Sequence, residues 1–328
     1  SMAQGFNAGF NAGFNAGFNA EFKCQREFGW LLSIWLFLSG TGCGLFVLFK
    51  VLDLPLFFAL LGLGSIVLGG AVLLLELGSP TRAWRGVSRI RTSWLSRGVV
   101  FVCFFVLTGF LSVAPAFVSW LPWEGASLTG RALGWIAALC ALMIVLYPGF
   151  FLAKNRSIPF WNTAWLPAVL VCYAATGASA MILLGSGYLK GREGLRAFDS
   201  LAAVLIVVTC ILVGGYLLAM HRAGGPARES VRLLNAPPLS WTFRLGVILV
   251  GLLLPLLLVL WVPSAVVLAG GCMLAGGLLF RYCVLKVGVY VPPALVQEGM
   301  DFSRLNRTGT DLEREYAGMA AQRAGGRG

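Results

Sequence analysis

Long apolar runs recur along the whole chain, separated by short polar or basic stretches. Each run reaches the roughly 20 residues that a helix needs to cross the hydrocarbon core of a bilayer. The pattern therefore predicts an all-α integral membrane protein, with its helices in two four-helix bundles. Eight transmembrane helices are expected, at Phe28–Leu48, Leu54–Glu76, Val99–Leu121, Ala132–Leu152, Trp165–Leu184, Leu201–Met220, Leu245–Val262 and Ala265–Leu285.

The regions outside these runs divide the chain into three parts. Residues 1–25 form a low-complexity arm that repeats Gly-Phe-Asn-Ala four times, and we expect it to be flexible or ordered by a partner. Residues 26–291 are the eight-helix membrane domain, and residues 292–328 are a polar C-terminal tail. The arm has neither a basic start nor an apolar core, so the sequence predicts no cleavable signal peptide.

The stretch between the second and third runs shows a helical periodicity of apolar residues. Gly78-Ser79-Pro80 ends the second helix, because proline lacks an N–H and restricts the residue before it. Apolar residues then recur every three or four positions, which predicts a short amphipathic segment in the membrane interface. They are Trp84, Val87, Ile90 and Trp94. The alternative is a basic connecting loop. In either case its arginines face water or dock a partner, and they are Arg85, Arg89, Arg91 and Arg97.

Composition supports a membrane protein and argues against nucleic acid as a partner. Of the 328 residues, 58% are hydrophobic and 12% are charged, whereas soluble domains carry about 25% charged residues. The net charge of +12 comes from basic residues at the ends of apolar runs. Such placement indicates orientation in the bilayer.

The distribution of lysine and arginine predicts that orientation. An even number of spans puts both termini on one side. The loops and termini of that side carry 20 basic residues, and the opposite side carries five. The positive-inside rule then places both termini in the cytoplasm, in a multi-pass protein of the cell's inner membrane.

Few residues are available for redox or hydrolytic chemistry. The eight cysteines show no CxxC spacing, so we expect no iron–sulfur cluster. A single histidine, His221, excludes a haem with two histidine ligands. We see no metal site, P-loop or nucleophile triad, and the sequence predicts a subunit without substrate chemistry of its own.

Polar and aromatic groups do gather at the ends of the spans on the basic side. Glu76 and Arg82 flank the end of the second span, Tyr147 lies near the end of the fourth, and Trp30 opens the first. A carboxylate, a phenol, an arginine and aromatic walls suit a quinone, whose carbonyls need donors and whose reduced form must lose protons. The alternatives are a structural Glu76–Arg82 salt bridge and a belt of interfacial aromatics.

Four stretches give the chain a resemblance to a known family. They are Gly29-Trp30 with Leu36-Phe37-Leu38-Ser39-Gly40, Leu77-Gly78-Ser79-Pro80-Thr81-Arg82-Ala83-Trp84 with Ser93-Trp94-Leu95-Ser96-Arg97, Tyr147-Pro148-Gly149 with Pro159-Phe160-Trp161-Asn162 and Leu166-Pro167, and Arg281-Tyr282 with Lys286-Val287-Gly288-Val289-Tyr290. In this order, across eight spans, the sequence resembles the NrfD-like membrane-anchor subunits of polysulfide reductase, DMSO reductase and cytoplasm-facing sulfite dehydrogenase.

The resemblance implies a cofactor-free subunit that exchanges electrons with menaquinone or ubiquinone. Its expected partners are a four-cluster iron–sulfur subunit and a molybdopterin catalytic subunit. Tyr147 matches a tyrosine placed at the quinone, and Arg82 matches an arginine near the quinol. Glu76 stands where one branch has a histidine. Gly98 stands where many relatives have a glutamate, so either Glu76 takes over the proton role or the site is altered. We expect Trp30 and Trp161 to wall the pocket.

The charge bias makes one assignment within this family preferable. It puts the basic, Tyr147-bearing side in the cytoplasm, which favours a sulfite:quinone oxidoreductase. The alternative is the anchor of a periplasm-facing DMSO, polysulfide or thiosulfate reductase. A structural anchor without a quinone site and a secondary transporter are further alternatives, although the sequence shows no clear internal repeat and its charges lie at span ends.

Overall fold

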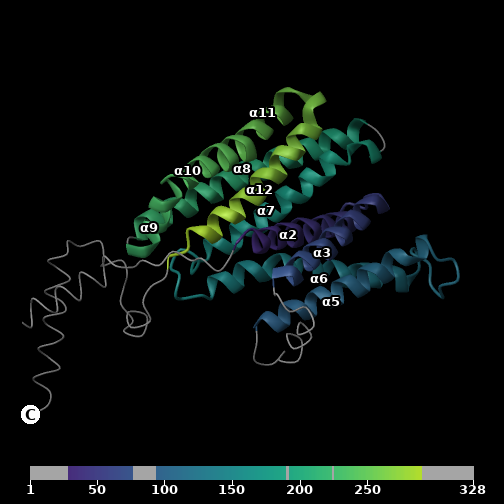
Figure 1. Cartoon of the computed structure of the whole chain (residues 1–328). Helices are drawn as coiled ribbons and strands as arrows, with labels where there is room; N and C mark the ends of the chain where they lie inside the picture. The colour runs from purple at the N-terminus through teal and green to yellow at the C-terminus, as the bar shows by residue number, and fades with distance from the viewer. Residues whose placement is uncertain (1–28, 77–93, 190–191, 224, 290–328) are drawn as a thin grey trace, which may run out of the picture.

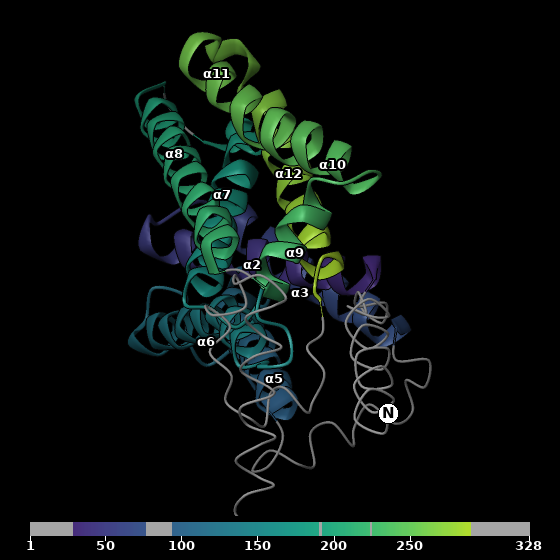
Figure 2. The same ribbon diagram turned by 90° about the vertical axis from the view of Figure 1, so that its left-hand side faces the viewer.

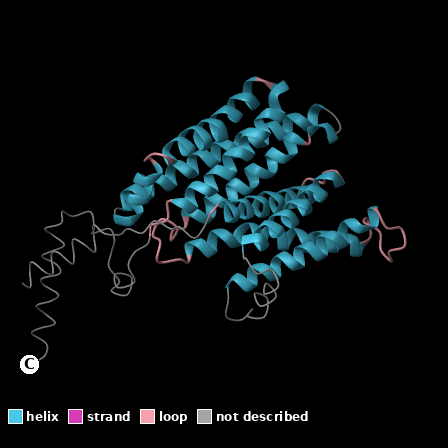
Figure 3. Ribbon diagram, in the orientation of Figure 1, coloured by secondary structure: helices cyan, strands magenta, loops and turns pink. Residues whose placement is uncertain are grey.

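The computed structural model describes residues 29–76, 94–189, 192–223 and 225–289, and all regular secondary structure in these ranges is helical (Figures 1 and 3). Eight helices in this part of the chain are long and apolar enough to cross a membrane, as the hydropathy pattern predicts. Their elements are α2 (Trp30–Val51), α3 (Leu56–Glu76), α5 (Trp94–Val113), α6 (Leu128–Ala153), α7 (Trp165–Leu184), α8 (Arg192–Ala223), the seventh span described below, and α12 (Val266–Lys286).

Some helix boundaries differ from the limits of the apolar runs, because a capping residue or a proline determines where the helix begins or ends. The third span ends at Val113 instead of Leu121, because Pro115 follows and the chain continues as the 3₁₀ turn η2 (Ala114–Ala116). The fourth span begins at Leu128, since the Ser127 hydroxyl accepts a hydrogen bond from the Gly130 N–H at 3.2 Å.

The seventh span is built from three consecutive helical segments. A short α10 (Leu239–Trp241) leads into the π-helix η4 (Thr242–Leu253), which is followed by α11 (Leu254–Trp261). The 3₁₀ turn η5 (Pro263–Ala265) then reverses the chain into α12. The tight hairpin expected at Pro263 and Ser264 is therefore present.

The spans form two groups that meet along α2, α7 and α12 (Figures 1 and 2). Helices α2, α3, α5 and α6 make the first group, and α7, α8, the seventh span and α12 make the second. Helix α7 packs against α2 and α6 on one side and against α8 and α12 on the other. Two four-helix bundles are thus joined through a shared centre.

Glycines permit the closest approach between helices in both groups. A Cβ atom added to Gly251 of η4 would lie 2.5 Å from the Gly276 Cα of α12. A Cβ on Gly42 of α2 would lie 2.8 Å from the Gly62 carbonyl oxygen of α3. Helices in lipid associate mainly by such close packing, because lipid tails are as apolar as leucine.

A short amphipathic helix, α9 (Gly225–Leu234), connects the sixth and seventh spans. It buries Ala227, Val231 and Leu234 and exposes Arg228 and Arg232. The hydropathy pattern does not predict this element, because its few apolar positions alternate with charged residues and do not form a hydrophobic run. The amphipathic segment predicted between the second and third spans falls at 77–93, outside the described residues.

We predict that Gly276→Ala lowers the Tm of the purified protein, since the added methyl group meets the backbone of Gly251. Overpacking of this kind costs about 1–3 kcal/mol. Gly271→Ala in the same helix is the control, because nothing lies within 4 Å of a Cβ there. Equal thermal stability of the two variants would contradict the packing argument.

Candidate functional site

The residues expected to form a site lie at one end of the bundle, which we call the site end. Helices α2, α5 and α7 begin there, and α3, α6 and α12 end there (Figure 1). Consecutive spans run antiparallel, so the helix ends alternate between the two ends of the bundle. Glu76 is the last residue of α3. Arg82, Arg85, Arg89 and Arg91 lie outside the described residues.

Tyr147 lies on α6, about two turns before that helix ends. Its half-buried ring packs against Gly98 of α5, where an added Cβ would be 2.8 Å from the tyrosine Cε1. Gly98 thus makes room for the phenol. Arg97 is exposed on the same turn of α5, close enough for its charge to act on Tyr147. Phe151 stacks beside the phenol at 5.8 Å between ring centroids.

Trp30, the first residue of α2, stacks on Tyr282 near the end of α12. The ring centroids are 3.9 Å apart and the planes differ by 11°. The Lys286 ammonium lies 5.9 Å from the centre of the Tyr282 ring. The Trp30 side chain remains 46% exposed, so a planar ligand at the edge of the bundle has access to the indole.

Trp161 is fully buried in the connector between α6 and α7. Its indole N–H donates to the Val284 carbonyl of α12 at 3.0 Å. A Cβ on Gly288 would lie 2.9 Å from the Trp161 ring. The same connector is held on the α8 side, where the Tyr216 hydroxyl donates to the Phe160 carbonyl at 2.6 Å. Trp161 therefore holds the connector against the last span. This structural role is not evident from the sequence.

Arg281 is the most unusual charged residue at this end of the protein. It is 3% exposed inside α12. Its Nη1 donates to the Gly277 carbonyl at 2.9 Å. The guanidinium lies over the rings of Phe37 and Tyr173, at 5.6 and 5.9 Å.

The helices around Arg281 are shaped to accept it. A Cβ on Gly40 of α2 would lie 3.1 Å from Arg281 Nη2, so glycine leaves space for the guanidinium. The buried Tyr173 hydroxyl and the Ser39 hydroxyl have no hydrogen-bond partner among the described residues. A charged residue at the centre of a membrane span costs about 2.5–3.5 kcal/mol. Cation–π contacts offset part of the smaller cost that Arg281 meets near the end of its span.

The structure thus places the predicted residues in two groups at the site end. Trp30 and Trp161 both contact the last turns of α12, whereas Tyr147 packs on α5 beside Arg97. Sequence reasoning did not select Tyr282, Lys286 or Arg281 as site residues. The signal was an aromatic and two basic residues within six positions at the end of the last span. An exposed aromatic stack with nearby cations fits a planar conjugated carbonyl compound such as a quinone.

We predict that Trp161→Phe lowers the free energy of unfolding by about 1–3 kcal/mol, because the buried Val284 carbonyl loses its donor. Thermal unfolding of the purified protein would measure the loss. Trp120→Phe serves as the control, since Trp120 is 82% exposed. An unchanged Tm for Trp161→Phe would show that the hydrogen bond from Trp161 to Val284 does not stabilise the fold.

Comparisons with known proteins agree with the architecture. The family model described as "Polysulphide reductase, NrfD" matches residues 21–293. The chain is also similar to Protein NrfD of Escherichia coli (strain K12), with 27% identity over 299 residues. That alignment covers 79% of this chain and 94% of the relative.

Proposed function

The chain belongs to the NrfD (polysulphide reductase) family, and on that basis we propose that it is the quinone-reactive membrane subunit of a molybdopterin and iron–sulfur oxidoreductase. Members of this family interact with quinone and anchor a partner subunit in the membrane. The observation that carries the proposal is the half-exposed Trp30–Tyr282 stack, which lies at the same end of the bundle as Tyr147 and the end of α3.

Each predicted residue has a role in this proposal. Reduction of a bound quinone takes up two electrons and two protons, and oxidation of the quinol releases them. Tyr147 donates a hydrogen bond to a quinone oxygen, and Glu76 accepts or returns a proton. Arg82 holds that carboxylate or a quinone oxygen. Trp30 stacks on the ring, and Trp161 completes the wall of the pocket from within the bundle.

The partner docks at the site end, so that electrons pass between the quinone and its nearest cluster. Arg97, which is exposed next to Tyr147, is the described member of the proposed docking set. Arg85, Arg89 and Arg91 are its other members. The partners are a four-cluster iron–sulfur subunit and a molybdopterin subunit that carries out the substrate chemistry.

Replacement of the proton-handling and quinone-binding groups tests this function. We expect Glu76→Gln to reduce quinone-linked turnover of the purified complex about 100-fold or more, since the group that accepts or donates the proton is lost. Tyr147→Phe removes one hydrogen bond, and we expect a decrease of about tenfold. Co-purification of the partner subunits should be unchanged. Glu124→Gln and Tyr188→Phe, at the opposite end, are the matched controls. Full turnover in both site variants would favour a purely structural anchor.

The proposed substrate follows from orientation. Because the basic site end is expected to face the cytoplasm, the complex is proposed to be a sulfite:quinone oxidoreductase. A site end in the periplasm would instead favour an exported DMSO, polysulfide or thiosulfate reductase. A secondary transporter is disfavoured by the position of Arg281, which is held by packed rings and glycines near the end of a span.

Cysteine labelling decides this orientation. Arg156 is exposed in the connector at the site end, and Glu124 lies before α6 at the opposite end. With a membrane-impermeant maleimide, we expect Arg156→Cys to react in inverted vesicles and Glu124→Cys to react in intact spheroplasts. The native chain measures background labelling of its own cysteines. The reverse pattern would overturn the cytoplasmic assignment and the sulfite proposal together.

A further inference from the structure

A cavity of about 310 Å³ opens beside α9, where the sixth span gives way to the seventh. Five of its six lining residues carry polar or charged side chains. The residues that line it are His221, Arg228, Glu229, Val231, Arg232 and Asn235. None of these residues has a role in the quinone proposal.

The backbone of α9 holds this cavity in a defined shape. Ser230 is fully buried and its hydroxyl donates to the Pro226 carbonyl at 3.2 Å, while Val231 and Leu234 belong to the core. The apolar face of α9 is therefore fastened to the bundle. Its opposite face presents Arg228 and Arg232 beside His221, which lies in the last turn of α8.

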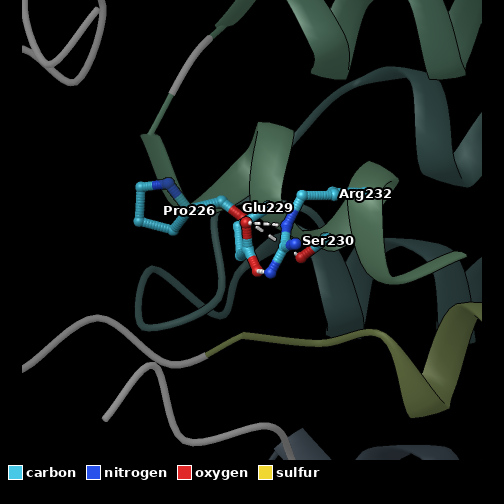
Figure 4. Close-up of polar contacts among 4 residues, drawn as sticks. All are labelled: Pro226, Glu229, Ser230 and Arg232. Atoms are coloured by element: carbon cyan, nitrogen blue, oxygen red, sulfur yellow. Dashed lines mark hydrogen bonds and ion pairs between the residues drawn. The ribbon is translucent and has the colours of Figure 1, made fainter. Parts of the chain in front are cut away.

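The guanidinium of Arg232 is already oriented by an acidic neighbour. Its Nε and Nη2 donate to the two carboxylate oxygens of Glu229 at 2.8 and 2.6 Å, as Figure 4 shows. Hydrogen bonding to Glu229 raises the pKa of Arg232, so the side chain stays protonated. Arg232 is exposed, and such surface pairs contribute little to stability. The pair can therefore open, or accept a second anion, at low energetic cost.

A third guanidinium lies beside the cavity. Arg244 of η4 donates from Nη2 to the Asn235 side-chain oxygen at 3.1 Å. The three arginines outnumber the one carboxylate among the described residues of this region. The cavity thus carries a net positive charge and offers several N–H donors suited to phosphate oxygens.

Large exposed apolar residues flank this basic cavity on both adjoining spans. Leu218 lies about one turn before His221 and is 50% exposed, and Trp241 and Leu245 are 66% and 46% exposed. An exposed tryptophan beside an arginine at a span end is typical of the membrane–water boundary. A soluble anion would use only the charged groups, whereas a phospholipid would use both surfaces.

We propose that this cavity is a binding site for the phosphate headgroup of an anionic phospholipid, whose acyl chains lie along the exposed apolar residues of α8 and η4. Basic pockets between transmembrane helices bind such headgroups, and amphipathic helices rich in arginine lie in the plane of the interface. The site is independent of the quinone assignment, because it shares no residue with it. Bound lipid would hold α9, which connects α8 to the seventh span, at the membrane surface.

Lipid titration of the purified, delipidated full-length chain with its co-purifying partners tests the proposal. We expect phosphatidylglycerol to raise the Tm in a saturable way, and phosphatidylcholine with the same acyl chains to raise it far less. Each basic residue contributes about 1 kcal/mol to such binding, which is about fivefold in affinity. The Arg228→Gln, Arg232→Gln double variant should therefore bind phosphatidylglycerol about 25-fold more weakly. Arg131→Gln at the opposite end of the bundle is the matched control.

A second variant gives a change of opposite sign. Glu229→Gln removes the competing carboxylate, so we expect phosphatidylglycerol to bind several-fold more tightly. A merely structural Glu229–Arg232 pair would predict a lower Tm and no gain in affinity. This variant keeps the test decisive even if the double variant folds poorly.

Three results would overturn the lipid assignment. Equal stabilisation by both lipids would leave no role for the charged cavity. A full effect from inorganic phosphate alone would show a free-anion site instead of a lipid site. Loss of the partner subunits from the double variant, with lipid binding unchanged, would identify the surface as a protein-docking face.

Discussion

Close contact between helices in an apolar solvent is the constraint on which the rest of this structure depends. Lipid offers no hydrogen bonds to an exposed backbone, so each span must satisfy its own N–H and C=O groups as a helix. Lipid also gives little hydrophobic reason for helices to associate. The spans approach instead through glycines, such as Gly251 against Gly276 and Gly42 against Gly62, where backbone meets backbone.

The last span, α12, packs closely against several other spans. It contacts α2, α7 and the seventh span, and its final turns receive Trp30 from one side and Trp161 from another. One helix end therefore sets the positions of residues that come from the first span and from the middle of the chain. A shift of α12 would change the candidate site and the connector together.

Arg281 shows how a polar residue is accommodated at this junction. Neighbouring aromatic faces and the absence of a side chain at Gly40 provide its surroundings. The interior is thus built around a charge that sits within about two turns of the end of α12. Its position next to Tyr282 links the interior of the bundle to the exposed stack with Trp30.

The sequence by itself determined the number of spans, their order and the end of the bundle at which polar groups gather. Hydropathy is a local property, and the length of each apolar run is enough to define a span. It also identified Trp30, Tyr147 and the end of α3 as neighbours of one membrane face. Their roles remain predictions, and Arg82 with most of the proposed docking arginines lies outside the described residues.

Only the tertiary structure decided which face of each helix meets which neighbour. Nearly uniform apolar spans do not indicate which face of the helix points inward. Hydropathy therefore did not distinguish the central helix α7, in which 83% of an 18-residue stretch is buried, from the peripheral helix α5, in which 22% is buried. For the same reason, the pairing of Trp30 with Tyr282 and of Trp161 with Val284 was not predictable. These contacts join residues more than 100 positions apart, and they exist because packing fixes the rotation of every helix at once.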